Sequence, residues 1–280
     1  MLSFITWTVD PVAFTIPVID KEIRWYGILF ALGFAVGCYL VSKQWKNEKL
    51  NDAWYDKLFF YVIVSATVGA RLGHCLFYNP GFYLAHPSEI LKIWEGGLAS
   101  HGGTLGIIIA VYFFSKNVTH TGMLWTFDRL VVPVGFVAAF IRMGNLMNHE
   151  IYGHETTVPW AFRFITNLND WEHKGALPLF SPPSHPTQIY EATCYVLTAL
   201  LCMWLYWKKD AYKTRGLIFG VFLIGIFLTR FCIEYIKNNQ ESFEEGWIFN
   251  MGQILSIPFI LAGCWFVYKA FKTSKINKQA

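Results

Sequence analysis

Three arginines lie inside or at the end of long apolar runs, where a permanent charge is expensive. Arg71 stands in VGARLGHCLFY, Arg142 in FIRMGNLMNHEIYG and Arg230 in LIGIFLTRFCIEYIK. An arginine near the centre of a bilayer costs about 2.5–3.5 kcal/mol on insertion scales, so such positions indicate paired or functional side chains. A guanidinium is always charged and forms bidentate contacts with phosphate, which makes anion binding the chemistry that we expect here.

A histidine within a glycine-rich stretch is the second chemical signal. The run EGGLASHGGTLG over 95–106 places glycines on both sides of His101. A histidine can accept a proton near neutral pH. Gly102 and Gly103 would let backbone approach a ligand, and a helix starting after them would direct its N–H groups at an anion. Close packing of helices through small residues is the alternative explanation.

Each of these side chains also has a purely structural interpretation. Arg230 could pair with Glu234 one turn along the same helix. Arg142 could snorkel to the membrane interface, and for Arg71 snorkelling is the favoured interpretation. A hydrogen-bonded structural role is the commoner fate of a lone histidine such as His101.

The chain is too apolar for an ordinary soluble protein. Its 280 residues are 54% hydrophobic and only 15% charged, with a mean hydropathy of +0.36, whereas soluble domains carry about 25% charged residues. Runs of roughly 20 apolar residues predict membrane-spanning helices, and the alternating strands of a membrane barrel are not seen. We therefore predict an all-α integral membrane protein with seven transmembrane helices, near 24–42, 58–78, 96–115, 125–141, 189–207, 216–236 and 251–268.

The distribution of Lys and Arg predicts the orientation of these spans. Basic residues are concentrated in 43–57, 208–215 and 269–278, and such segments face the cytoplasm. The C-terminus is then cytoplasmic and the N-terminus faces outward. Within the single polytopic domain 1–280, the proline-rich segment 142–188 is expected to form a small outward-facing loop subdomain.

Further polar residues fall toward the outer half of the predicted bundle. Besides the arginines, they are His101, Asn145, Asn148, Glu150, His185, Gln188 and Glu191. For the two glutamates, ion pairing with the arginines is favoured over a chemical role. The gathering of these residues predicts a polar, partly dry chamber that opens near the outer leaflet.

Other features argue against several classes of protein. All six cysteines fall in predicted spans and form no CxxC pair, so neither a disulfide framework nor a zinc site is expected. The net charge of +4 does not by itself suggest binding of nucleic acid. We expect no metal and no cofactor.

Seven segments in this order resemble the prolipoprotein diacylglyceryl transferase family. They are WYGILFALGF (25–34), ARLGHCLFYNP (70–80), WEGGLASHGGTLG (94–106), RMGNLMNHEIYG (142–153), HPTQIYE (185–191), LTRFCIEYIK (228–237) and NMGQILSIP (250–258). The resemblance covers nearly the whole chain, and the RxGNxxNxExxG block is its most specific part. Two positions depart from the family pattern: Ile141 stands where glycine is common, and His149 where glycine or glutamine is frequent.

The resemblance implies an enzyme of the bacterial cytoplasmic (inner) membrane that carries out the first step of lipoprotein maturation. That family transfers the diacylglyceryl group of phosphatidylglycerol to the lipobox cysteine thiol of a prolipoprotein, forming a thioether and releasing glycerol phosphate. The implied partners are phosphatidylglycerol, the prolipoprotein signal peptide and the surrounding membrane lipid. The family's functional positions correspond to Tyr26, His101, Arg142, Asn145, Arg230, Glu150 and Gly153.

The chemistry of these side chains agrees with such a reaction. Displacement at a saturated carbon requires a bound phosphate leaving group and a thiolate nucleophile. We predict that Arg142 holds the phosphate and that Arg230 stabilises its departure or orients the peptide. His101 is predicted to assist deprotonation of the thiol. The residues predicted to bind substrate are Arg142, Tyr26, Asn145, Glu150, Gly153, Gly102 and Gly103.

Three rival classes fit the sequence less well. A transporter or channel would carry polar residues along the full depth of the membrane. A retinal-type receptor needs a lysine in its last span, and 251–268 has none. A phosphotransferase that cleaves at phosphorus generally requires metal-binding aspartates, whereas the only aspartate within a span, Asp128, lies near the predicted cytoplasmic end.

Overall fold

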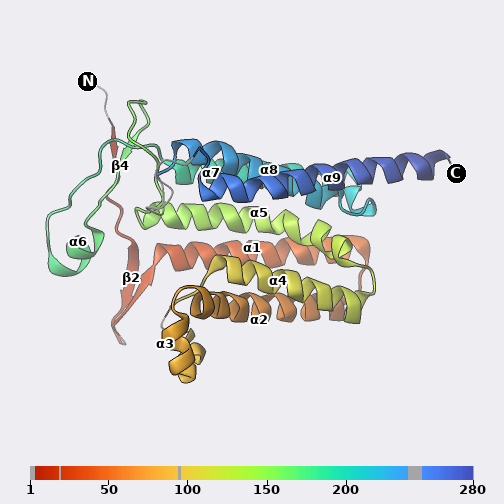
Figure 1. Ribbon diagram of the computed structural model, residues 1–280, viewed down its shortest axis with the longest axis horizontal. Helices are drawn as coiled ribbons and strands as arrows, with labels where there is room; N and C mark the ends of the chain where they lie inside the picture. Colours follow the sequence, from red (N-terminus) through yellow and green to blue (C-terminus); the bar gives the residue numbers. More distant parts are fainter. Residues whose placement is uncertain (1–3, 19, 94–95, 239–247, 280) are drawn as a thin grey trace. The chain divides into compact units, whose positions relative to one another are not determined.

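The chain is predominantly helical (Figure 1) and forms two compact units. The computed structural model describes residues 4–18, 20–93, 96–238 and 248–279, with side chains of the last helix described as far as residue 273. The first unit combines Met1–Leu40 with Leu130–Ala280, and the second comprises Val41–Arg129. Helices α1 and α5 contribute to both units, because the boundaries fall within them.

The first unit is built on a row of long helices. They are α1 (Trp25–Glu48), α5 (Met123–Met147), α7 (Thr187–Lys209), α8 (Leu217–Ile233) and α9 (Met251–Gln279). Each neighbouring pair meets where a glycine removes the side chain that would hold the backbones apart. The contacts are Gly33 with Phe140 (α1–α5), Gly135 with Ala199 (α5–α7), Gly225 with Thr198 (α7–α8) and Gly220 with Gly263 (α8–α9).

Short strands and a short helix accompany the row of helices in this unit. Strand β1 (Ile5–Thr6) pairs in parallel with β4 (Phe162–Arg163), and β2 (Val12–Ile16) pairs antiparallel with β3 (Lys21–Arg24). Helix α6 covers Leu168–Lys174. The segment predicted as an outward loop from residue 142 therefore has elements of its own, and it begins later than predicted because α5 continues to Met147.

The second unit is a helical hairpin with short connecting helices. Helices α2 (Asp52–Phe77) and α4 (Ser100–Phe114) lie side by side and antiparallel. The links are α3 (Pro80–Ala85) and the 3-10 helix η1 (Pro87–Leu91), and α4 continues into a π-helical turn, η3 (Ser115–Thr119). Beyond this turn, the buried guanidinium of Arg129 pairs with Glu48 and lies 3.7 Å from the centroid of the Trp125 ring.

Among the described residues, six helices are long and apolar enough to cross a membrane. They are Trp25–Glu48, Asp52–Phe77, Met123–Met147, Thr187–Lys209, Leu217–Ile236 (α8 with the 3-10 turn η5, Glu234–Ile236) and Met251–Thr273. These six correspond to predicted spans. The predicted span 96–115 is the exception, because its helix begins only at Ser100 and has 15 residues, or about 22 Å at 1.5 Å per residue.

Candidate functional site

The end of α5 carries a chain of polar side chains that runs into the following turn. The Nη1 of Arg142 donates to Oδ1 of Asn145 (3.2 Å), and Nδ2 of Asn145 donates to the Glu150 carboxylate (2.8 Å). Asn148 donates to the same carboxylate oxygen from 3.2 Å. His149 and Ile151 have positive φ angles of 55° and 61°, and this reversal of the chain turns Glu150 back toward α5. The RxGNxxNxE spacing therefore encodes one hydrogen-bonded unit.

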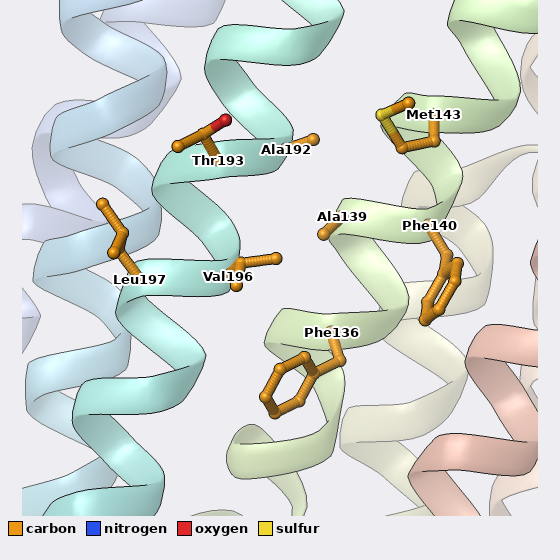
Figure 2. A pocket seen from close by; sticks show the side chains of 8 residues that line it. All are labelled: Phe136, Ala139, Phe140, Met143, Ala192, Thr193, Val196 and Leu197. Atoms are coloured by element: carbon orange, nitrogen blue, oxygen red, sulfur yellow. The ribbon is translucent and has the colours of Figure 1, made fainter.

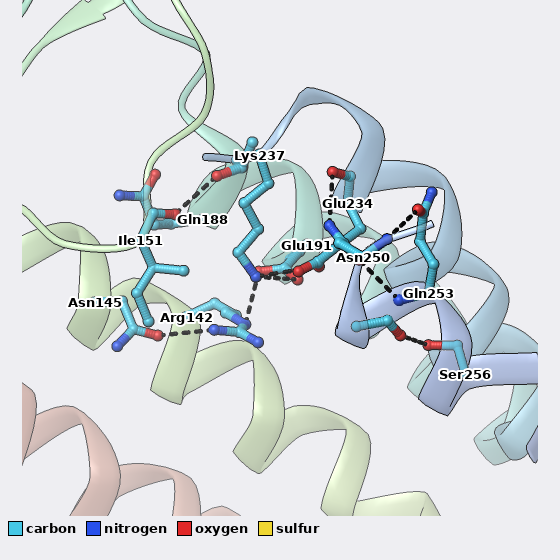
Figure 3. Close-up of polar contacts among 12 residues, drawn as sticks. Arg142, Asn145, Ile151, Gln188, Glu191, Glu234, Lys237, Asn250, Gln253 and Ser256 are labelled. Carbon is cyan, nitrogen blue, oxygen red and sulfur yellow. Dashed lines mark hydrogen bonds and ion pairs between the residues drawn. The ribbon is translucent and has the colours of Figure 1, made fainter. Parts of the chain in front are cut away.

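A buried carboxylate on α7 holds the other side of Arg142. Oε2 of Glu191 lies 2.8 Å from Nε of Arg142, and its Oε1 lies 3.7 Å from Nζ of Lys237. Lys237 also lies 3.4 Å from the Glu234 carboxylate (Figure 3). The Glu191 side chain is 0% exposed and that of Lys237 is 1% exposed. Burial lowers the pKa of Lys237 and the Glu191 carboxylate opposes that shift. Buried charges are costly and weak evidence for stability, which makes this cluster the candidate for a functional site.

Backbone contacts fix the turn after α5 against α7 and the end of α8. Gln188 Nε2 donates to the Glu150 carbonyl (2.6 Å), and Thr187 Oγ1 donates to the Ile151 carbonyl (2.8 Å). Gly153 forms an antiparallel bridge with Lys237. A Cβ on Gly153 would collide with the carbonyl oxygen of Ile236, which explains why this position needs glycine.

Tyr26 lies in the first turn of α1, against the backbone of α5. A Cβ added to Gly144 would lie 2.7 Å from the Tyr26 ring, so the ring occupies the space that a side chain at residue 144 would fill. The Tyr26 hydroxyl lies within electrostatic reach of Glu150 and Arg142. The structure thus brings Tyr26, Arg142, Asn145 and Glu150 together, as the sequence predicted.

Arg230 lies in the last turn of α8 and does not form the ion pair that its spacing to Glu234 allowed. Glu234 pairs with Lys237 instead. Within the described part of the chain, the buried Nε of Arg230 has no hydrogen-bond partner. Arg230 is close enough to influence both Tyr195 and Lys237 electrostatically. It therefore belongs to the same charged neighbourhood as Arg142.

Residues of the NMGQILSIP block contact the backbone at the end of α8. Gln253 Nε2 donates to the Phe231 carbonyl (3.3 Å), and Asn250 Nδ2 lies 3.5 Å from the Glu234 carbonyl. A Cβ on Gly252 would lie 2.6 Å from the Glu234 carboxylate. This block supports the position of Glu234 rather than adding charge of its own.

Sequence reasoning missed Lys237, and it missed Tyr195, which lies within electrostatic reach of Glu191, Arg142 and Arg230. Lys237 follows an apolar span directly, a position at which a lysine is usually solvated. The available signal was its spacing from Glu234, three residues away, which places opposite charges on one helical face. Tyr195 lies one turn after Glu191 on α7, and this spacing was the corresponding signal for it.

His101, Gly102 and Gly103 belong to the second unit. His101 is exposed in the first turn of α4, with ring centroids of Phe77 and Tyr78 at 5.5 Å and 5.9 Å. The helix begins at Ser100, before the two glycines and not after them as the sequence suggested. Gly102 is buried against Gly69 and Gly73 of α2, so helix packing accounts for this glycine. A role for Gly102 and Gly103 in binding remains a prediction.

The snorkelling interpretation of Arg71 is wrong. Arg71 is 4% exposed and donates to the carbonyls of Ile90 (2.9 Å) and Glu89 (2.6 Å). It also donates to the carbonyls of Gly96 (2.6 Å) and Gly97 (3.3 Å). The buried guanidinium therefore fixes the backbone that leads into α4.

The helices and the charged cluster define a multi-pass membrane protein with a polar site at one end of its helices. The chain belongs to the prolipoprotein diacylglyceryl transferase family, whose model matches residues 11–269. Three relatives named phosphatidylglycerol–prolipoprotein diacylglyceryl transferase illustrate the similarity. The protein of Porphyromonas gingivalis is 54% identical over 282 residues, covering 99% of this chain and 98% of the relative. That of Chloroherpeton thalassium is 42% identical over 278 residues, with the same coverage, and that of Bacteroides fragilis 39% over 280 residues, with 96% of each chain covered.

Proposed function

We propose that the chain transfers the diacylglyceryl group of phosphatidylglycerol to the lipobox cysteine thiol of a prolipoprotein. A carbon–sulfur bond forms at the diacylglyceryl carbon that carries the phosphate. The bond between this carbon and the phosphate oxygen breaks, so that glycerol phosphate leaves with the bonding electron pair. The observation that carries the proposal is the buried cluster around Arg142 in a chain of this family. The thiol proton must be removed as the thiolate attacks.

The charged cluster suits the phosphate side of this reaction. Arg142 is held on one side by Glu191 and on the other by Asn145. A guanidinium fixed in this way loses little freedom when it binds a phosphate, and low surrounding polarity strengthens the contact. Arg142 with Tyr26 and Asn145 binds the head group, and Glu150 and Gly153 maintain the shape of the turn. Arg230, whose Nε has no partner among the described residues, stabilises the departing phosphate.

The assignment of a base rests on residue type. His101 is an exposed imidazole at the first turn of α4, and histidine is the side chain most often used as a general base. Gly102 and Gly103 keep the first turns of α4 close against α2 beside it. Replacing His101 by Gln is expected to lower turnover most strongly at neutral pH, where a neutral imidazole can accept a proton and few thiols are ionised, and least at alkaline pH, where thiolate forms without a base.

The membrane arrangement completes the proposal. We assign α4 as a seventh span, because α2 and α4 pack through small residues and the π-helical turn η3 extends the helical segment to Thr119. The C-terminus faces the cytoplasm and the loop subdomain faces outward, in the bacterial inner membrane. Both substrates then reach the site from within the bilayer.

The test is a transfer assay with purified protein, phosphatidylglycerol liposomes and a fluorescent lipobox peptide. Phosphatidylglycerol that carries ¹⁸O between the diacylglyceryl carbon and phosphorus identifies the broken bond. The proposal expects the label in released glycerol phosphate, no product with a Cys→Ser peptide, and loss of transfer in Arg142→Ala. Label in a diacylglycerol product would show cleavage at phosphorus, and the proposal would be wrong.

A further inference from the structure

An apolar groove lies between α5 and α7, directly beside the ion pair of Arg142 and Glu191. Its volume is ≈ 390 Å³, within the range of small-molecule pockets. Met143 and Ala192, which immediately follow the two paired residues in sequence, both line it. Figure 2 shows the two helices with Ala139, Met143, Ala192 and Val196 facing the gap between them. The groove thus begins where the charged cluster ends.

The groove is bounded at both ends by contacts between the same two helices. At one end, a Cβ on Gly135 would lie 2.8 Å from the Cβ of Ala199, so the backbones nearly touch. At the other end, Arg142 and Glu191 join the helices through an ion pair of 2.8 Å. Between these points the small side chain of Ala139 leaves the gap unfilled. The groove therefore lies between two contacts that fix the spacing of α5 and α7.

The lining has the chemistry of a hydrocarbon site. Phe140 and Val196 present apolar side chains to it. The one hydroxyl of the lining, that of Thr193, already donates to the Ile189 carbonyl (2.8 Å). An apolar groove that ends at the guanidinium of the Arg142–Glu191 pair complements a molecule with a hydrocarbon chain next to an anionic group. A membrane phospholipid with an anionic head group is such a molecule.

We propose that this groove holds the first part of one acyl chain of the anionic lipid whose phosphate binds at Arg142. The inference rests on the proposed function and identifies where one acyl chain of the donor lies. From Phe136 to Met143 the groove extends about 10 Å along α5, roughly a third of the hydrocarbon thickness of a bilayer. It therefore contacts the carbons nearest the glycerol and leaves the rest of the chain in the membrane. Donor selection then depends on branching or unsaturation near the ester, and little on total chain length.

The test is photolabelling with phosphatidylglycerol that carries a diazirine close to the ester carbonyl of one acyl chain. In a parallel experiment, zwitterionic phosphatidylcholine carries the same diazirine. We expect labelling of α5 and α7 peptides containing 139–143 and 192–196, and more of it from phosphatidylglycerol. Two variants fill the groove from different sides, Ala139→Phe and Val196→Trp, and both should reduce labelling several-fold. Ala31→Phe makes the same change as the first at an exposed position of α1 and should leave labelling unchanged.

The transfer assay adds a second readout. Filling the groove should raise KM for phosphatidylglycerol about ten-fold. A change of this size is expected when one or two methylene groups of the acyl chain lose their contacts with the protein. The proposed acyl-chain site would be overturned by equal labelling from both lipids or by labelling confined to other helices. Unchanged labelling in both variants would overturn it as well. Absence of transfer with selective labelling would instead contradict the proposed function and leave the groove standing.

Discussion

The carboxylate of Glu191 lies 2.8 Å from Nε of Arg142, and its second oxygen lies 3.7 Å from Nζ of Lys237. One fully buried carboxylate thus connects cations from two different elements. Taking such groups out of water costs several kcal/mol for each ion, and only mutual attraction and hydrogen bonds offset that cost. The cluster is therefore sensitive to the loss of any one member.

Replacing Glu191 by Leu is expected to destabilise the protein strongly. The change leaves Arg142 and Lys237 without their shared carboxylate, and breaking a buried ion pair in this way costs about 3–5 kcal/mol. Glu191→Gln keeps the shape and a hydrogen-bond acceptor, so its loss should be smaller. Thermal unfolding in detergent, followed by near-UV circular dichroism, measures both changes.

The matched control is the exposed ion pair between Lys174 and Asp170, whose Nζ–Oδ1 distance is 2.7 Å. Lys174→Ala should change stability by less than about 1 kcal/mol, because both partners are solvated. Similar shifts in Tm for Glu191→Leu and Lys174→Ala would contradict the structural importance of the buried cluster.

His149 is expected to make the stability of the loop subdomain depend on pH. Its Nδ1 accepts from the Ile165 N–H (3.1 Å), so its Nε2 must carry the proton that is shared with the Val9 carbonyl (2.9 Å). Burial lowers its pKa from the ordinary value of 6.5, while Val9 and the carboxylates of Glu172 and Asp10 oppose the shift. A lowered folded-state pKa means that the contribution to stability is complete above about pH 6.5. It is lost as the pH falls through the folded-state pKa.

The measurement compares Tm at pH 7.5 and pH 5 for the parent protein and His149→Gln. Glutamine does not titrate, so the drop in Tm on acidification should shrink by about 2–4 °C for each kcal/mol that His149 contributes. His86→Gln replaces an exposed histidine and should leave the drop unchanged. An equal acid effect in His149→Gln and the parent would contradict this assignment.

The long helices could be predicted from the sequence, whereas the pairing of short strands and the burial of Lys237 could not. Apolar runs located α1 and α5 because membrane helices are recognised by length and composition alone. The pairing of Ile5–Thr6 with Phe162–Arg163 was not predictable, since two-residue strands leave no periodic pattern. Residues near Arg142 in sequence were recognised from one block. Lys237 was not, because its burial depends on how the end of α8 meets the turn around Gly153.

Arg71→Lys is expected to loosen the backbone that leads into α4. The guanidinium donates from three nitrogens to the carbonyls of Glu89, Ile90, Gly96 and Gly97, and a lysine amine cannot reach all of them from one point. Losing one charge-assisted hydrogen bond costs about 1.5–3 kcal/mol. Hydrogen exchange of the amides in 96–103 should therefore become at least about ten-fold faster.

A role for this backbone in presenting His101 predicts coupled effects on turnover. Arg71→Lys and His101→Gln should each lower kcat, and the double variant should lose no more than the worse single variant. Arg24→Lys is the control, since Arg24 is partly exposed and donates to the Glu172 carboxylate (3.1 Å). Fully additive losses, or unchanged exchange in Arg71→Lys, would show that Arg71 does not position this segment.

Gly144→Ala is expected to weaken binding of phosphatidylglycerol by displacing Tyr26. The new Cβ would lie 2.7 Å from Cδ2 of the Tyr26 ring and 3.2 Å from its Cγ, so the ring must move from its place against α5, where it lies within electrostatic reach of Arg142 and Glu150. A shift of about 1 Å at a positioning residue can cost on the order of 100-fold in rate. We expect KM for phosphatidylglycerol to rise and kcat/KM to fall by at least about ten-fold.

Gly27→Ala is the control one residue after Tyr26, where a Cβ meets nothing within 4 Å. Alanine there should be neutral or stabilise α1 by about 0.5–1 kcal/mol. Equal activity of the two variants would show that the position of Tyr26 does not govern donor binding.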